Sequence, residues 1–424
     1  MAGELLDRVA GHFARVETRR RFGVLLRGML ADLPRKNCWS LAEHAGEATP
    51  DGMQHLLARA VWDDDAVAAH VRGFVAEHLA DPAGVLVADE TGDLKKGSCT
   101  VGTQRQYTGT AGRIENAQVA VYLTYAGRDG HALIDRELYL PRSWTDDPDR
   151  LRGAGVPDGV GFATKPALAA QMIERALDAG VAARWMTGDE VYGADPGLRA
   201  RLEAHGLGYV LAVAANHHVR ISAGPGGRMR VDRIAAALDE HCWQRRSAGS
   251  GAKGPRIYEW ALIALDPSDG SGSSDGLGHR YLLIRRHPGH GELAFYRCYS
   301  PGPVPLGELV RVAGVRWRIE ESFQAAKGLV GLDQHQVRRW GSWRRWTVIA
   351  MAAHALLAVL AAKERTRPRP DGLIALTCHE IAHLFNRLVI NPARRLINPL
   401  TWTNWRCRHQ HRARECHYRA RPAT

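Results

Sequence analysis

Residues 84–90 read Gly-Val-Leu-Val-Ala-Asp-Glu, a short apolar run that ends in two acids. Apolar residues in succession, without alternation, are typical of a strand that is buried on both faces of a sheet. Because charged side chains are costly to bury, two acids directly after a buried strand indicate the point where the strand reaches the exposed end of the sheet. We therefore predict that Asp89 lies at the carboxyl end of a central strand, where open α/β sheets bind their ligands.

Strands and helices alternate after this run. The segment 118–126 and the segment 132–141 are strand-like, and the Gly-Arg-Asp-Gly turn at 127–130 between them predicts a hairpin. Helical patterns follow at 166–180 and 196–206, and strand-like patterns at 183–193 and 209–215. This order predicts a mixed α/β (α+β) sheet that is covered by helices.

The flanking segments differ in composition from this alternating part. Residues 1–80 read as basic helices, which are either solvated or in contact with DNA, and residues 217–300 are rich in Gly and Ser and read as a β insertion. The predicted domains are therefore 1–80 helical and DNA-binding, 81–216 first part of the core, 217–300 β-rich insertion, 301–390 helical second part of the core, and 391–424 basic tail.

Charge and composition narrow the function classes. The 424 residues include 57 Lys and Arg against 45 Asp and Glu, a net charge of +12 that suits a polyanionic partner. Seven scattered cysteines indicate reduced thiols rather than a disulfide framework. The apolar run 347–362 is shorter than the roughly 20 residues of a membrane span, so we expect a buried helix, no membrane partner and a cytoplasmic protein.

Two further segments carry acids in an informative setting. The segment Thr187-Gly188-Asp189-Glu190 has the same pattern as residues 84–90, a predicted strand that is followed by two acids. In 315–329, helical spacing places Arg316, Glu320, Phe323 and Lys327 on one face, which is a poor core stripe. The alternatives are a helix-capping or turn acid for each Asp and an exposed Arg–Glu pair on the helix. Neighbouring acids compete by position with each choice; they are Glu90, Glu190 and Glu321.

These motifs together resemble a known family. The run RWRIEE (316–321), with Lys327 beyond it, is similar to the signature around the last acid of bacterial DDE transposases of the IS4-like superfamily. The chain resembles most the IS701 family of insertion-sequence transposases. Further matches to this family are ADETG (88–92) with Lys95-Lys96-Gly97, TGDEVYG (187–193), the RKN tripeptide (35–37) and the Trp- and Arg-rich tail.

The resemblance implies a fold and a site. The family has a ribonuclease-H-like core in which three carboxylates bind two divalent ions; here these are Asp89, Asp189 and Glu320. The implied cofactor is Mg²⁺ or Mn²⁺, which oxygen ligands favour. Arg316 and Lys327 are the matching phosphate-binding residues, whereas the family's Tyr before the Arg is replaced by Ala313. The hairpin route of strand cleavage is therefore not implied.

The tail has its own predicted role. Arg406 and Arg408, beside Trp402 and Trp405, predict a basic arm that binds DNA phosphates and stacks on bases. A zinc site is the alternative for the cysteines and histidines of the tail, although their spacing is uncommon. The tryptophans and arginines of 338–346 have two interpretations as well, as core residues or as a second DNA contact.

The predicted function is cut-and-paste DNA transposition. The protein would cleave double-stranded DNA at the terminal inverted repeats of an element and join the freed 3′ ends to target DNA, acting as a homodimer on DNA near the bacterial nucleoid. The alternatives are a DDE-type nuclease without strand transfer and a catalytically inactive DNA-binding protein.

Overall fold

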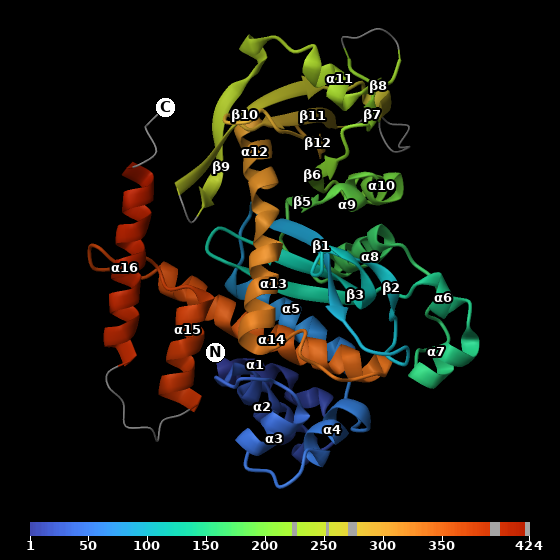
Figure 1. The fold of residues 1–424 in the computed structure, drawn as a ribbon, viewed down its shortest axis with the longest axis vertical. Helices are drawn as coiled ribbons and strands as arrows, with labels where there is room; N and C mark the ends of the chain where they lie inside the picture. Colours follow the sequence, from blue (N-terminus) through green and yellow to red (C-terminus); the bar gives the residue numbers. More distant parts are fainter. Residues whose placement is uncertain (223–226, 252–253, 270–277, 391–398, 420–424) are drawn as a thin grey trace.

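A ten-stranded mixed sheet runs through the protein, with helices on its faces (Figure 1). The computed structural model describes residues 1–222, 227–251, 254–269, 278–390 and 399–419. The strands of the sheet are β1 Val85–Leu94, β2 Gln104–Thr108, β3 Arg113–Ala126, β4 His131–Leu138, β5 Trp185–Gly188, β6 Gly208–Val213, β9 Gln244–Gly251, β10 Gly254–Ala264, β11 His279–Arg286 and β12 Leu293–Ser300. β7 (His218–Val219) and β8 (Met229–Arg230) pair separately.

The order of the strands confirms the predicted mixed sheet. β1 is antiparallel to β3 on one side and parallel to β5 on the other, β4 pairs with β3, and β6 continues parallel to β5. Three antiparallel strands followed by two parallel ones is the ribonuclease-H-like arrangement that the resemblance implies. Val85, Leu86, Val87 and Ala88 are fully buried, as their apolar run predicts.

The predicted end of β1 is wrong. The strand continues through Asp89 to Leu94, because its second half keeps pairing with β3. On its other side, β5 pairs only with residues 85–87 of β1. Asp89 therefore lies beyond the end of its parallel neighbour rather than at the end of its own strand, and the edge of β1 that faces the β5 side is open there.

The segment predicted as a β insertion extends the main sheet. β12 pairs with β6, and β11, β10 and β9 follow in order. The sequence predicted a β insertion that does not continue the α/β unit. The strands of the insertion instead continue its sheet, because the last of them, β12, pairs with β6. A separate apolar cluster, including Val231, Leu282 and Phe295, packs on one face of this extension.

Helices of the first 80 residues pack below the sheet in the view of Figure 1. They are α1 Ala2–Val9, α2 Val16–Leu30, α3 Cys38–His44, α4 Asp51–Ala58 and α5 Asp64–His78. Asn37 of the RKN tripeptide caps α3, and its side chain accepts hydrogen bonds from the backbone of Trp39 and Ser40. Lys36 is buried and donates to the carbonyl of Leu329, near the end of α13. The tripeptide thus joins the first helices to the helix that carries Glu320.

The remaining helices connect and cover the strands. Between the strands lie α6 Arg142–Thr145, α7 Pro148–Ala154, α8 Lys165–Asp178, α9 Glu190–Gly193, α10 Pro196–Ala204 and α11 Val231–Ala236. After the last strand follow α12 Leu306–Val315, α13 Trp317–Val330, α14 Trp340–Arg365, α15 Cys378–Phe385 and α16 Pro399–Arg419.

Helix α14 forms the centre of the helical layer. It is long and apolar enough to cross a membrane, and 89% of its apolar window is buried inside the protein. Trp340, Trp343 and Trp346 are at most 7% exposed, so they are core residues. Figure 1 shows α14 between the sheet and helices α1–α4, with α5 beside it. The predicted buried helix is confirmed, and the tryptophans of this segment do not form a DNA-binding surface.

Candidate active site

Asp89, Asp189 and Glu320 come from three distant segments to one place beside the sheet. Asp89 lies in β1, Asp189 follows β5 directly, and Glu320 lies in the first turn of α13. Arg316 connects two of them: its Nη1 lies 3.6 Å from Oδ2 of Asp89, and its Nη2 donates to Oε1 of Glu320 at 2.9 Å. Asp189 lies close enough to Asp89 to repel its charge.

Local folding explains these positions. β1 and β5 are parallel neighbours, so residues that follow their paired parts emerge at the same edge. Helix α13 is fixed over that edge by Phe323, whose ring packs edge-on against Tyr122 with centroids 5.5 Å apart. Tyr122 is the direct partner of Asp89 in β3. The packing of Phe323 therefore sets how near Glu320 comes to β1.

Asp189 has a structural role as well. It is the N-cap of the short helix α9, and its Oδ1 accepts a hydrogen bond from the backbone N–H of Val191 at 2.9 Å. Asp189 is therefore a helix-capping residue, as the alternative interpretation held. This role does not prevent it from being a metal ligand as well. A carboxylate has two oxygens, so the cap fixes its orientation and leaves Oδ2 for another ligand.

The three acids are held in an environment that disfavours their charge. Burial, together with the nearby charges of Asp189 and Glu90, raises the pKa of Asp89 to about 7. Burial and the charge of Glu90 raise the pKa of Asp189, and burial raises the pKa of Glu320 despite its contact with Arg316. One guanidinium does not neutralise this cluster, so its chemistry is that of a site for additional cations.

The carboxylates of the three acids are spread more widely than the closest group of possible metal ligands among the described residues. Among the described residues, three ligand side chains with all their ligand atoms within 4.8 Å occur at Glu4, Glu77 and His78, not at the three acids. At that surface cluster, Arg8 already donates to both glutamates. Two divalent ions lie ~3.5–4 Å apart, with ligands about 2 Å beyond each ion. The ligand atoms of a two-ion site can therefore lie farther apart than 4.8 Å, so the spacing of the three acids does not conflict with such a site.

The competing acids have other partners. Glu90 accepts from Lys165 Nζ at 2.6 Å and from the hydroxyl of Tyr192 at 2.8 Å. Glu321 is held by His131 and Arg318, which keep its pKa low, at about 2. The side chain of Glu190 is exposed. Glu90 and Glu321 are thus engaged by side chains other than Arg316, and the choice of Asp89 over Glu90 stays a prediction.

Lys327 lies at the same edge, further along β1. Its Nζ donates to Oγ1 of Thr91 at 2.6 Å and lies 3.9 Å from Oδ1 of Asp93. Asp93 in turn contacts the fully buried ring of His335 at 3.1 Å. Thr91, Asp93 and His335 hold Lys327 beside the acids, and sequence reasoning missed all three.

A cavity of about 740 Å³ opens beside Arg316, between α12–α13 and the sheet extension. It combines aromatic rings with guanidinium groups; its lining includes Tyr258, Trp260, Tyr296, Trp317, Arg256 and Arg285. Ala313 lines the same cavity. Aromatic faces and arginines are the groups that hold an unstacked nucleotide. Trp317 follows the Arg of the quoted motif directly and was not singled out from the sequence.

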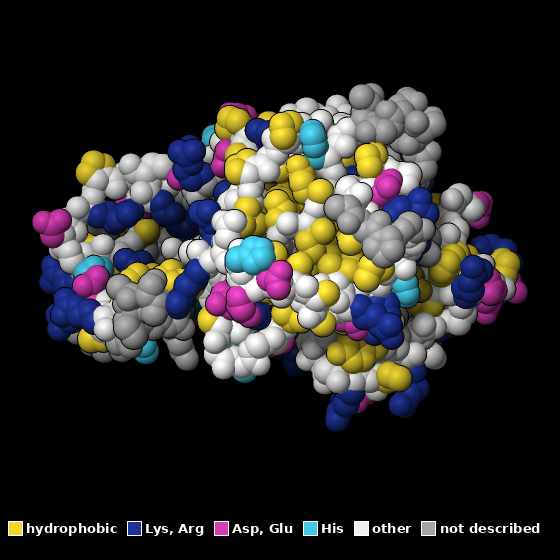
Figure 2. Space-filling model, turned by 90° about the horizontal axis from the view of Figure 1, so that it is seen from above, with side chains coloured by type: hydrophobic (Ala, Val, Ile, Leu, Met, Phe, Trp, Pro, Cys, Tyr) yellow, Lys and Arg dark blue, Asp and Glu magenta, His cyan; other side chains and the backbone are white. Residues whose placement is uncertain are grey.

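The predicted DNA contacts of the tail are only partly visible. In α16, the side chain of Arg408 is exposed, whereas those of Arg406, Trp402 and Trp405 lie outside the described residues. Figure 2 shows Lys and Arg side chains gathered over the end of the molecule that carries α16. The side chain of His409 lies outside the described residues as well, so the zinc alternative stays a prediction.

Comparison with known proteins identifies the family. Residues 8–255, more than half of the chain, match the DDE superfamily endonucleases, and residues 163–356 match the transposase DDE domain. The chain belongs to the DDE superfamily. Enzymes of this superfamily generally use divalent metal ions, and the nuclease class follows from membership. The predicted relationship is thus confirmed.

One curated protein and one solved structure are similar to the chain at lower coverage or identity. The chain is 30% identical over 212 residues to the "Probable transposase for insertion sequence element IS701" of Microchaete diplosiphon, which covers 49% of this chain and 52% of that protein. The chain thus matches about half the length of this relative. The cryo-EM structure of the piggyBac transposase synaptic complex with hairpin DNA aligns with 92% of this chain and 76% of that one, at 12% identity and a TM-score of 0.43.

Proposed function

We propose that this DDE superfamily protein is a transposase that cleaves DNA at the ends of an insertion sequence and transfers the freed 3′ ends to target DNA. The observation that carries the proposal is the junction made by Arg316, which contacts both Asp89 and Glu320, while the charge of Asp189 raises the pKa of Asp89. The match to the transposase DDE domain and the IS701 relative support the same conclusion.

In this proposal, Asp89, Asp189 and Glu320 would hold two Mg²⁺ or Mn²⁺ ions. The bound ions would supply an activated water or 3′-hydroxyl and stabilise the leaving 3′-oxygen. Arg316 keeps Asp89 and Glu320 in register and offers its remaining N–H groups to a phosphate oxygen of the cleaved strand. Lys327 provides a second, point-like charge for the next phosphate.

The cavity beside Arg316 supports a nucleic-acid substrate. Its aromatic and guanidinium lining suits a nucleotide next to the cleaved bond, and Trp317 is 50% exposed there. The exposed Arg408 on α16 would bind phosphates outside the catalytic centre. Cutting two ends of one element together requires two active sites, so we propose a dimer on DNA.

The decisive experiment separates cleavage from joining. The purified protein is incubated with Mg²⁺, a labelled duplex that carries the element end and a circular target plasmid. With the wild type, we expect the labelled duplex to be cleaved and part of the label to become covalently joined to the plasmid. Both products should be absent with Asp89→Asn and with Asp189→Asn. Cleavage without joined product would establish a nuclease instead, and DNA binding without either would establish a DNA-binding protein. Wild-type activity of Asp89→Asn would overturn the site.

A further inference from the structure

A second cavity, of about 320 Å³, opens at the N-terminus of α14, away from the proposed catalytic acids. Helices α3 and α4 and the segment 336–342 enclose it; its polar and aromatic lining includes Trp39, Gln54, Gln336, Arg338, Arg339 and Ser342. All residues that line it are described, and none of them is Asp or Glu. The charge of the cavity wall is therefore positive.

The helix end itself lacks the usual partner. The N-cap of α14 is Arg339, which makes no side-chain capping hydrogen bond. Within the described chain, the backbone N–H groups of Gly341 and Ser342 donate to no acceptor. A Cβ on Gly341 would meet nothing within 4 Å, so this backbone is open to approach. The aligned peptide dipoles of a helix of 26 residues favour an anion at such an end.

A largely buried serine lies at the same place and presents its hydroxyl to the cavity. Ser342 lines the cavity, is only 7% exposed, and its hydroxyl has no hydrogen-bond partner among the described residues. The side chain is thus held in place by its surroundings while its hydroxyl is free to bond a ligand in the cavity. Arg338 and Arg339 are exposed, and neither guanidinium has an ion pair in the described part of the chain. Donors from backbone, hydroxyl and guanidinium thus converge without an acceptor.

The remaining lining matches DNA better than a small anion. Trp39 is 65% exposed, which is unusual for so large an apolar side chain, and Gln54 and Gln336 are exposed beside it. Amide side chains bond base edges and tryptophan packs on sugars or bases, whereas a free phosphate needs neither.

The segment that forms this cavity is attached to the strand that carries Asp89. The ring of His335 lies 3.1 Å from Asp93, and the carbonyl of Arg338 accepts from the backbone N–H of Val101 at 3.0 Å. Asp93 is four residues beyond Asp89 in β1, about 13 Å along the strand. One duplex can therefore reach both places.

We propose that the N-terminus of α14 binds a phosphodiester of the duplex DNA substrate, with Ser342 and the helix N–H groups on one phosphate and Arg338 and Arg339 on its neighbours. This rests on the proposed function and adds a DNA contact to it. The tryptophans after Arg339 are core, and the two arginines before Trp340 are the DNA-binding part of that segment.

The test compares Ser342→Asp and the double variant Arg338→Ala/Arg339→Ala with the wild type. Binding of a short mixed-sequence duplex is measured by fluorescence anisotropy over a range of chloride concentrations, in phosphate-free buffer. We expect each variant to bind about tenfold more weakly, with the salt slope reduced by about one for each lost phosphate contact. An aspartate in the first turn favours the helix but adds a charge at a largely buried position, so the thermal midpoint of each variant is measured to check that the fold is kept.

A matched control has the same loss of charge elsewhere. Arg201→Ala/Arg233→Ala removes two exposed arginines from α10 and α11, at the opposite end of the molecule in Figure 1, and should bind as the wild type does. If Ser342→Asp and the Arg338/Arg339 variant both match this control in affinity and slope, the proposal is overturned.

A final arm separates DNA from free phosphate. Added inorganic phosphate at constant ionic strength is compared with chloride by thermal unfolding. Stabilisation of the wild type but not of Ser342→Asp, together with unchanged DNA binding, would show a phosphate site and overturn the DNA contact. Failure of the proposed function appears in a different assay, as the absence of label joined to the target plasmid.

Discussion

Arg316 is the residue through which the candidate site is organised. It stands between α12 and α13, in backbone conformation continuous with both helices, and its side chain reaches acids in β1 and in α13. Burial raises the pKa of both carboxyl groups in spite of this contact. The guanidinium therefore holds the acids in position and leaves their charge incompletely balanced, which is what a metal site requires.

The pKa of Asp89 predicts how stability responds to pH. Because the folded protein raises this pKa from 3.8 to about 7, it binds a proton between pH 4 and 7 that the unfolded chain has released. The stabilising contribution is complete below pH 4 and is lost as the pH rises through 7. Without metal, the thermal midpoint of Asp89→Asn should exceed that of the wild type at pH 8, by roughly 1–3 °C.

Addition of Mg²⁺ should reverse this difference. Metal ions bind the deprotonated carboxylate, so the wild type should gain more stability from Mg²⁺ at pH 8 than at pH 6, and Asp89→Asn should gain little at either. Scanning calorimetry with and without the ion measures both. An equal response of wild type and variant would remove Asp89 from the metal site.

The neighbouring acid provides a comparison of near-identical chemistry. Glu90 is neutralised by Lys165 and hydrogen-bonded by Tyr192. We expect Glu90→Gln to reduce the rate of DNA cleavage less than about tenfold, whereas loss of a proposed metal ligand, in Asp189→Asn, should reduce it by three orders of magnitude or more. Single-turnover cleavage gives both rates. A larger loss in Glu90→Gln than in Asp189→Asn would exchange their roles.

These contacts mark the limit of what the sequence could predict at this scale. The apolar runs before Asp89 and Asp189 show which acids reach an exposed edge, because burial has a local signature. Lys165 and Tyr192 lie 75 and 102 residues from Glu90, and no local pattern links them to it. The same holds for His335 on Asp93.

Strand β1 shows why the ends of a strand are harder to predict from the sequence than its presence. Its buried half has an obvious apolar run, but four of the five residues 89–93 are Asp, Glu or Gly, which are poor strand formers. They are extended because β3 pairs with them to the end. A tertiary partner therefore overrides local preference, and it places Asp93 and Thr91 next to Lys327.

The close approach of α12 to β9 depends on one glycine. A Cβ on Gly314 would lie 1.9 Å from the carbonyl oxygen of Ala248 in β9, so Gly314→Ala must separate the helix from the strand. We expect Gly314→Ala to lower the free energy of unfolding by about 1–3 kcal/mol, as at other overpacked sites. The rate of DNA cleavage should fall as well, because Arg316 is two residues away.

Gly307 in the same helix is the control for this prediction. A Cβ there meets nothing within 4 Å, and Gly307→Ala should stabilise the protein by up to about 1 kcal/mol through helix propensity. Urea unfolding followed by circular dichroism compares the two. Equal stability of the two alanine variants would show that β9 is not held against α12.

At the scale of the whole molecule, the continuous sheet explains how the parts act together. The sequence indicated separate strands in 217–300 correctly, but pairing order is a long-range property, and the contact of β12 with β6 had no sequence signal. The consequence is mechanical: the wall of the cavity beside Arg316 is formed by strands of the same sheet as Asp89.

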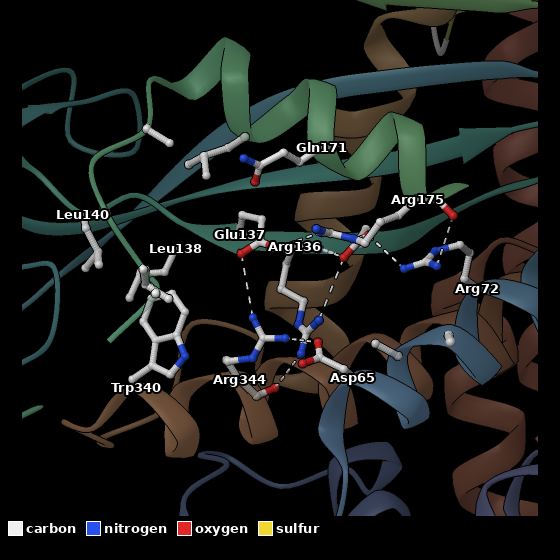
Figure 3. A pocket seen from close by; sticks show the side chains of 18 residues that line it. Asp65, Arg72, Arg136, Glu137, Leu138, Leu140, Gln171, Arg175, Trp340 and Arg344 are labelled. Atoms are coloured by element: carbon white, nitrogen blue, oxygen red, sulfur yellow. Dashed lines mark hydrogen bonds and ion pairs between the residues drawn. The ribbon is translucent and has the colours of Figure 1, made fainter. Parts of the chain in front are cut away.

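A buried ionic network joins the first helices to this sheet. Figure 3 shows Arg72 of α5, Arg136 and Glu137 of β4, Arg175 of α8 and Arg344 of α14 around a cavity of about 500 Å³. Asp135 is 1% exposed and accepts from Arg72 at 2.9 Å and from Arg175 at 3.1 Å. Arg344 reaches Asp64 in the first turn of α5 at 2.9 Å. The network thus spans four elements.

Removal of one acid from this network should be costly for the whole protein. Asp135→Asn keeps the shape of the side chain and leaves Arg72 and Arg175 without their shared carboxylate, beside the buried Arg136. Breaking a buried pair costs about 3–5 kcal/mol, so the thermal midpoint should fall by roughly 5 °C or more. Asp149→Asn, whose side chain is 90% exposed and pairs with Arg152, should change stability by less than about 0.5 kcal/mol. If calorimetry gives the two variants equal midpoints, the first helices are held to the sheet by apolar packing alone, since α5 and α14 would then need no ionic partner on β4.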